Sequence, residues 1–160
     1  MNLDKLNQWL TLLGNLGVVV GLIFLIIEVQ QNSQLMQAQT RDSVTEKTLS
    51  FYESIYGDTD TFENWESIRN RSEIAQPVSG EEMRFSQIAL ANFRLWENEW
   101  YQFQIGLFDI NEFEPRYVMW SRLLRSPAYR SLWDQMKASF APEFRNKIDS
   151  IISEIEAANQ

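Results

Sequence analysis

Residues 9–27, with the sequence WLTLLGNLGVVVGLIFLII, form a strongly apolar run that contains no charged residue. Its only polar side chains are those of Thr11 and Asn15. As an α-helix the run would extend roughly 28 Å, close to the hydrocarbon thickness of a bilayer. A core helix of a soluble bundle rarely contains so long an uncharged run. A cleaved signal peptide is also disfavoured, because Lys5 is offset by Asp4 and no small-residue cleavage site follows the run. The sequence therefore predicts a transmembrane helix that anchors the chain in a lipid bilayer.

Three glycines within this run share one face of the predicted helix. Gly14, Gly17 and Gly21 recur at steps of three and four residues, the spacing that aligns side chains on a helix. Small residues in such a stripe let a second helix approach closely. The stripe predicts a homo-oligomer interface, to which the neighbouring Asn15 could add a hydrogen bond. Packing against a different partner, or against lipid, is the alternative.

Glu28 follows the apolar run directly, and Gln31 lies three residues further on a neighbouring face. A carboxylate at the end of a membrane helix usually reaches water at the interface. In an oligomer, however, Glu28 and Gln31 would form rings of the kind that attract cations to a pore mouth. The sequence leaves both interpretations open.

The composition excludes several classes of chemistry. The chain contains no His and no Cys, so it lacks the usual zinc and iron ligands, thiol nucleophiles and Ser-His-Asp triads. Its net charge of -8 argues against a nucleic-acid partner, which needs clustered Lys and Arg. We therefore expect no cofactor, no metal and no enzymatic activity, and the sequence names no small-molecule ligand.

The rest of the chain has helical rather than strand periodicity, so we expect an all-α protein. Residues 1–28 are the predicted membrane anchor, residues 29–56 a stalk helix that continues from it and enters a core, and residues 57–160 a small soluble bundle. The segment 29–56 contains neither Gly nor Pro, and Gly57 ends it. In the bundle we expect five or six helices in all, and local residue patterns indicate where they begin and end.

These signals fall mainly at the ends of the predicted helices. Thr59 or Asp60 is the expected N-cap of the first short helix, and Ser126 that of a later one. Ser79 and Glu82 have the spacing of a capping box that opens a long aromatic helix ending at Gly106. Because apolar residues surround that helix, we expect it to be central. Three prolines are expected in the first turns of later helices, namely Pro115, Pro127 and Pro142. The last helix carries an amphipathic stripe, namely Phe144, Ile148, Ile151, Ile152 and Ile155.

Four polar residues interrupt the aromatic helix on a shared face, namely Arg94, Glu97, Asn98 and Tyr101. Arg94 and Glu97 have the spacing of an ion pair, and Tyr101 could donate to the Glu97 carboxylate. The interpretation we favour is a structural polar network that fixes helix register. Arg122 or Arg125 of the next helix would complete this network. The alternative is an acid or base whose pKa is raised among tryptophans, or a pocket for a lipid-like molecule.

Runs along most of the chain resemble a widespread family of uncharacterised bacterial proteins. They are GLIFLIIEVQQN, FRLWENEWYQFQIGLFD and SPAYRSLWDQMKASFAPEFRNKID. The family's core motif, RxxENxxYQxxxGL, falls here on Arg94, Glu97, Asn98, Tyr101, Gln102, Gly106 and Leu107. The resemblance implies a single membrane helix followed by a helical domain, and no particular activity.

With this resemblance we expect the bacterial inner membrane as the location. Lys5 lies before the predicted span, and Arg41 and Lys47 lie well beyond it. This nearly balanced distribution of positive charge determines orientation weakly. Because a short leader crosses a membrane easily, we expect the soluble domain in the cytoplasm. The predicted function is a homo-oligomeric scaffold or interaction module, with an oligomeric pore as the alternative and a ligand-binding bundle third.

Overall fold

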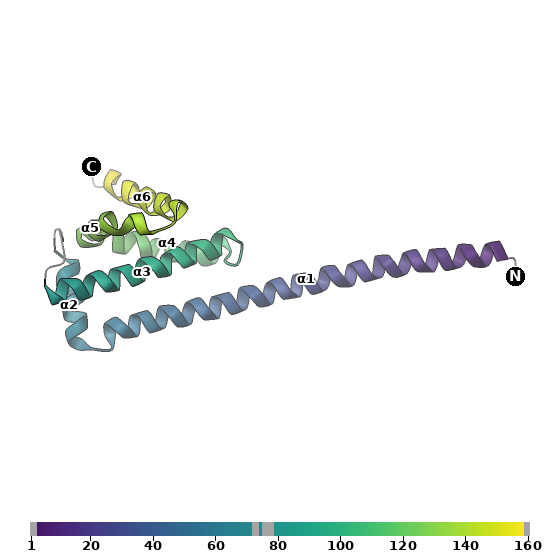
Figure 1. Ribbon diagram of the computed structural model, residues 1–160, viewed down its shortest axis with the longest axis horizontal. Helices are drawn as coiled ribbons and strands as arrows, with labels where there is room; N and C mark the ends of the chain where they lie inside the picture. Colours follow the sequence, from purple (N-terminus) through teal and green to yellow (C-terminus); the bar gives the residue numbers. More distant parts are fainter. Residues whose placement is uncertain (1–2, 72–73, 75–78, 159–160) are drawn as a thin grey trace. The chain divides into compact units, whose positions relative to one another are not determined.

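The computed structural model describes residues 3–71, 74 and 79–158. Within these residues the chain forms six α-helices and one short 3-10 helix, with no strand (Figure 1). The all-α prediction is therefore confirmed. The chain divides into two compact units, Met1–Gln39 and Thr40–Gln160.

Helix α1, Leu3–Tyr56, passes without interruption from the first unit into the second. The predicted membrane helix and the predicted stalk are thus one helix, as expected from the absence of Gly and Pro between Gly21 and Gly57. At its end the Gly57 N–H donates to the Glu53 carbonyl, with an N–O distance of 2.8 Å. This bond closes the last turn before the chain leaves the helix.

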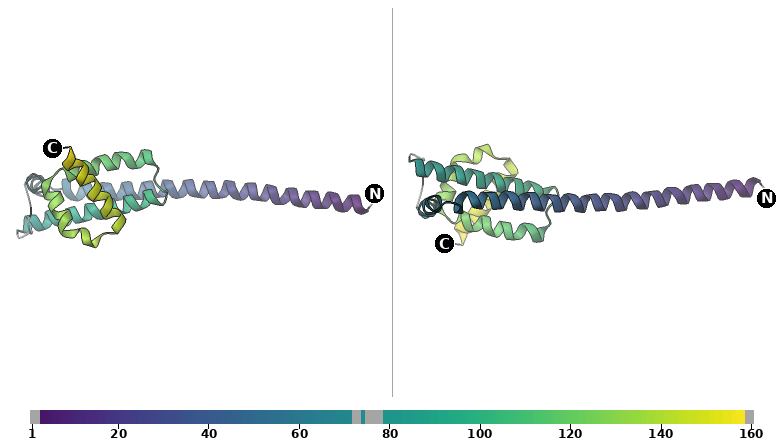
Figure 2. Two further views of the ribbon diagram at one scale, coloured as in Figure 1. Left: turned by 90° about the horizontal axis from the view of Figure 1, so that it is seen from above. Right: turned by 90° about the horizontal axis from the view of Figure 1, so that it is seen from below.

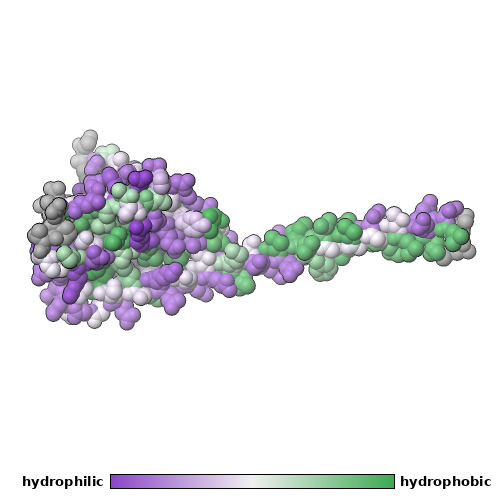
Figure 3. Space-filling model, viewed as in Figure 1, coloured by the Kyte–Doolittle hydropathy of each residue, from purple (hydrophilic) through white to green (hydrophobic). Residues whose placement is uncertain are grey.

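The first unit contains only the amino-terminal part of α1, and every described residue in it is exposed. Apolar side chains cover the segment 9–27 on the face that Figure 3 shows in green. This is the one helix of the described chain that is long and apolar enough to cross a membrane.

The second unit contains the end of α1 and all the other helices. These are α2 (Thr59–Arg69), α3 (Gly80–Gln104), α4 (Ile110–Leu124), α5 (Pro127–Met136), the 3-10 helix η1 (Lys137–Ser139) and α6 (Pro142–Ala157). Helix α3, drawn in teal in Figure 2, packs against α2, α4 and α5. The face of α3 that carries Gln87, Ala91 and Arg94 is exposed, so the helix is central on its buried face only and is not surrounded by other helices as expected. Helix α4 also packs against α5 and α6.

Local capping signals set most of the helix boundaries. The Ser79 hydroxyl accepts from the Glu82 N–H at 3.1 Å while the Glu82 carboxylate accepts from the Ser79 N–H at 3.2 Å, so the predicted capping box is present. Gly106, with a φ of 78°, follows α3 in the left-handed conformation that favours glycine. Ser126 caps α5, as expected.

Two boundary predictions were wrong. Asp58, not Thr59 or Asp60, is the N-cap of α2, because its carboxylate accepts from the Thr61 N–H at 3.0 Å. Pro115 lies inside α4 rather than in its first turn. Asp109 caps α4 and starts it earlier than the proline suggests, and the helix continues through Pro115 without one of its backbone hydrogen bonds.

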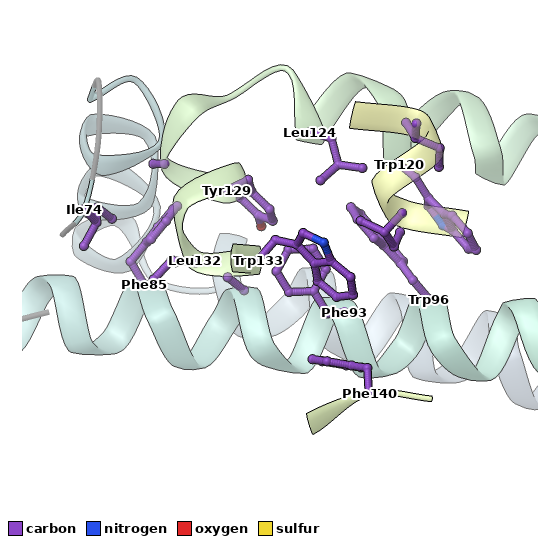
Figure 4. Packing of buried hydrophobic residues seen from close by; sticks show 14 of the residues in the cluster. Ile74, Phe85, Phe93, Trp96, Trp120, Leu124, Tyr129, Leu132, Trp133 and Phe140 are labelled. Atoms are coloured by element: carbon purple, nitrogen blue, oxygen red, sulfur yellow. The ribbon is translucent and has the colours of Figure 1, made fainter. Parts of the chain in front are cut away.

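Aromatic residues make up half of the hydrophobic core cluster of the second unit. The Phe93 ring lies among Tyr129, Trp133 and Phe140, with the closest ring centroid, that of Trp133, at 5.1 Å (Figure 4). The predicted stripe of α6 completes this core, with four of its residues buried: Phe144, Ile148, Ile151 and Ile155. Such rings remove large apolar surfaces from water and stabilise so small a bundle.

Candidate functional site

The second unit contains a cavity of about 280 Å³ between the end of α1, the middle of α3 and α4. The lining residues come from the segments 48–52 of α1, 92–99 of α3 and 112–123 of α4. The lining is mostly apolar and aromatic. A concave apolar site with a few polar groups is the usual form of a small-molecule site.

Glu99 is the buried charge of this cavity, with 3% of its surface exposed. Its Oε1 accepts from Nη1 of Arg116 at 2.5 Å, and its Oε2 accepts from the indole N–H of Trp120 at 3.1 Å. Burial raises the pKa of Glu99 above its ordinary value, while the Arg116 charge and the Trp120 hydrogen bond act against that rise. The carboxylate is therefore held by two donors from the same face of α4.

Aromatic rings surround this carboxylate. Trp96 and Trp120 are stacked, with ring centroids 5.4 Å apart and ring planes inclined by 20°. Tyr52 of α1 also lines the cavity, and its pKa is raised mainly by burial, with Tyr56 and the Glu99 carboxylate adding to the rise and Arg116 opposing it. The cavity thus combines π-faces with a buried acidic group.

Two further charged groups line the same cavity. The guanidinium of Arg116 lies over the Phe108 ring, 4.9 Å from its centroid, while its Nη1 donates to Glu99. Glu112 forms an ion pair with Arg41 of α1, and its side chain is 23% exposed. Arg41 itself is outside the lining. The cavity therefore presents two carboxylates and one guanidinium.

Sequence patterns pointed instead to Arg94 and Glu97, on a different face of α3. The expected ion pair forms, with 2.8 Å between Nη1 of Arg94 and Oε2 of Glu97. Arg94 also donates to the Ser139 carbonyl at 3.1 Å, and Oε1 of Glu97 accepts from the Ala141 N–H at 2.8 Å. These bonds tie the connection between η1 and α6 to α3.

The closure of this network differs from the expected one. Within the described residues the pair is completed by the backbone at Ser139 and Ala141, and no hydrogen bond joins it to Arg122 or Arg125. Helix α4, which carries Arg122, contacts α3 on the face of Trp96 and Glu99 and not on the face of Glu97, so the predicted closure was wrong. The alternative interpretation placed a raised carboxyl pKa among the tryptophans at Glu97, whereas the carboxyl group whose pKa burial raises is that of Glu99.

Asn98 and Tyr101 lie beside the same network, around a second hollow of about 350 Å³. Asn98 accepts from the Gln102 amide at 3.5 Å. The Tyr101 side chain is 57% exposed, and no hydrogen bond joins it to Glu97 in the described chain. The structure thus brings all four predicted residues to one surface but bonds only Arg94 directly to Glu97.

The sequence did contain a signal for Glu99. The residues that α3 buries recur at helical spacing, namely Phe85, Ala89, Asn92, Phe93 and Trp96, and the next position of this stripe is Glu99. A carboxylate at the end of a buried stripe needs a partner from another helix. Arg116 and Trp120, four residues apart on α4, are on one face and supply it.

The predicted interface and pore residues of the first unit are all exposed. A Cβ atom built at Gly14, Gly17 or Gly21 would meet nothing within 4 Å, so the glycine stripe is an open surface of α1. Asn15, Glu28 and Gln31 are likewise exposed. The lining of the cavity in the second unit comes entirely from residues 48–123.

Comparisons with protein-family models, with curated proteins and with solved structures find no match. Within the described residues no group of three or more acidic side chains is placed to hold a metal ion. Two features of the described chain are therefore candidates for function: the exposed apolar segment of α1 and the cavity beside Glu99.

Proposed function

We propose that the chain is a single-pass membrane protein of the bacterial inner membrane whose helical domain acts as a homo-oligomeric scaffold or interaction module. The observation that carries this proposal is the exposed, uncharged apolar segment at residues 9–27. Soluble proteins seldom expose apolar surfaces of this extent. A lipid bilayer covers such a segment with hydrocarbon and matches its length.

The glycine stripe supports self-association within the membrane. In lipid the hydrophobic effect does not drive helices together, so close packing at small residues and interhelical hydrogen bonds decide association. Gly14, Gly17 and Gly21 leave the backbone of α1 open to a second helix, and Asn15 beside them offers an amide. The resemblance to single-pass bacterial proteins is consistent with this architecture.

The pore alternative has less support. A conduction path needs polar side chains along one face of the span, and only Thr11 and Asn15 supply any within residues 9–27. The Thr11 hydroxyl already donates to the Asn7 carbonyl at 2.9 Å. Glu28 and Gln31 would then form a polar entrance to a pore whose helical lining is otherwise apolar.

The first test is the mass of the detergent-solubilised protein, measured by light scattering corrected for bound detergent. We expect a defined oligomer that dissociates in the Gly17→Ile and Gly21→Ile variants. Because the added side chains meet nothing in the protomer, any change of mass reports on assembly. Val19→Ile, on the opposite face of the helix, is the matched control. A monomeric wild-type protein in mild detergent would refute the homo-oligomer.

The membrane anchor and its orientation have a separate test. Since the chain contains no cysteine, a single Glu156→Cys variant provides one unique label, and Glu156 is exposed on α6. We expect the protein in the membrane fraction, with this cysteine protected in intact cells from a membrane-impermeant maleimide. Labelling in intact cells would place the domain on the other side, and recovery in the soluble fraction would refute the anchor.

A further inference from the structure

We propose that the cavity beside Glu99 binds a small organic cation with an apolar, ring-sized body, of the arylalkylamine class. This inference concerns the second unit alone and does not depend on the membrane anchor or on oligomer formation. Its basis is the size of the cavity, the nature of its walls and the balance of its charges.

The size of the cavity suits a molecule with one aromatic ring. Its volume is about 280 Å³, whereas an apolar cavity of about 150 Å³ already accepts benzene. The remaining space accommodates a short chain that ends in a polar group. A polypeptide or nucleic acid would not fit.

The walls suit a cation more than a neutral molecule. Phe51 and Tyr52 from α1 and the stacked Trp96 and Trp120 present ring surfaces around the cavity. The negative face of an aromatic ring attracts ammonium groups, and more strongly where water is excluded. The same rings pack well against an apolar ligand body.

The charged groups in the lining favour a ligand with a positive charge. Glu99 and Glu112 contribute two carboxylates, and Arg116 contributes the one guanidinium. Glu99 accepts one hydrogen bond at each oxygen, and a carboxylate has about four acceptor positions. An ammonium group can therefore be added to Glu99 without displacing Arg116. Within the lining a ligand carboxylate would meet two carboxylates against one guanidinium, since Arg41, the partner of Glu112, lies outside the lining.

The test uses three probes that share one ring and chain length and differ in charge: phenylethylamine, phenylethanol and phenylacetate. Binding to the full chain in neutral maltoside micelles is measured by calorimetry at neutral pH, where the amine is protonated. We expect the amine to bind about tenfold more tightly than the alcohol, and phenylacetate not to bind. Equal affinity for amine and alcohol, a preference for phenylacetate, or no binding of any probe would overturn the proposal.

A pair of neighbouring variants separates the cavity from micelle partitioning. Met119 lines the cavity and is 41% exposed, so Met119→Trp should fill the cavity and abolish binding. Val118, the adjacent residue, is 61% exposed and outside the lining, so Val118→Trp should bind as the wild type does. Undiminished amine binding by Met119→Trp would show that the site is elsewhere.

A second pair of variants tests the carboxylates. Glu99→Gln should remove most of the preference for the amine over the alcohol while the alcohol still binds. Glu112→Gln, which alters a half-buried group at the wall, should reduce the preference and is not expected to affect folding, so it keeps the proposal testable if Glu99→Gln does not fold. An unchanged preference in both variants would refute the role of the carboxylates.

Discussion

Replacing Arg116 with methionine should destabilise the second unit strongly at neutral pH and hardly at all in mild acid. Glu99 would lose the cation that lies 2.5 Å from its Oε1 while its side chain remains 4% exposed. Removing one partner of a buried ion pair typically costs about 3–5 kcal/mol. Methionine keeps an unbranched apolar side chain of similar length, so the change removes the charge with the smallest change in packing.

The loss of unfolding free energy that the unpaired charge causes has an upper bound, because an unpaired Glu99 can bind a proton. Protonating a carboxyl group of ordinary pKa 4.5 at neutral pH costs about 3.4 kcal/mol, at 1.36 kcal/mol for each pH unit. We therefore expect a loss of about 3 kcal/mol at neutral pH. In this variant the folded state binds one proton more than the unfolded state, so stability falls as pH rises above the ordinary pKa.

Urea unfolding of the full chain in maltoside, followed by tryptophan fluorescence, measures this effect between about pH 5 and about pH 7. The loss in Arg116→Met should shrink by about 1.4 kcal/mol for each pH unit towards acid. The double variant Glu99→Gln with Arg116→Met is the control, since its glutamine still accepts from Trp120 and no charge remains. A loss that is the same at every pH would refute the reasoning and assign the effect to packing.

Three further predictions concern other parts of the second unit. Burial raises the pKa of Tyr129 to about 12, so Tyr129 should lower stability by up to about 2.7 kcal/mol as pH rises from 10 to 12. In urea unfolding Tyr129→Phe should remove this part of the pH dependence and leave the part due to Tyr117, whose pKa is also raised to about 12. Glu97→Gln should lower stability by about 1–2 kcal/mol, because its carboxylate accepts from Arg94 and from the Ala141 N–H; thermal unfolding measures this, and an unchanged midpoint would contradict it. Gly106→Ala should cost about 1 kcal/mol in the same assay, since φ is 78° and the added Cβ meets nothing within 4 Å.

The features that the sequence predicted correctly depend on residues that are close together in the sequence. The capping box at Ser79 and Glu82, the Ser126 cap and the left-handed Gly106 each involve groups within one or two helical turns. Side-chain type and spacing are sufficient to predict such features. The continuous α1 follows in the same way from an unbroken stretch without Gly or Pro.

The candidate site depends on which face of α3 meets α4, and this was not decided by local spacing. Local spacing predicts the Glu97 ion pair because Arg94 lies three residues before it. The partners of Glu99 are 17 and 21 residues away on another helix. Both glutamates belong to a helix with apolar residues on several faces. Continuing the buried stripe from Phe85 through Trp96 leads to Glu99, but only the packing of α4 shows that Arg116 and Trp120 meet it.

The Glu99–Arg116 pair is better explained by the cavity than by stability. A buried ion pair can often be replaced as a whole by uncharged groups at little or no cost, although removing one partner is expensive. The double variant Glu99→Gln with Arg116→Met should therefore fold with nearly wild-type stability. If the pair serves recognition, this folded variant loses most of the preference for phenylethylamine over phenylethanol, and Glu112 accounts for the remainder. If it retains the preference for the amine, the charged pair contributes nothing to selectivity, and Glu112 alone would have to account for it.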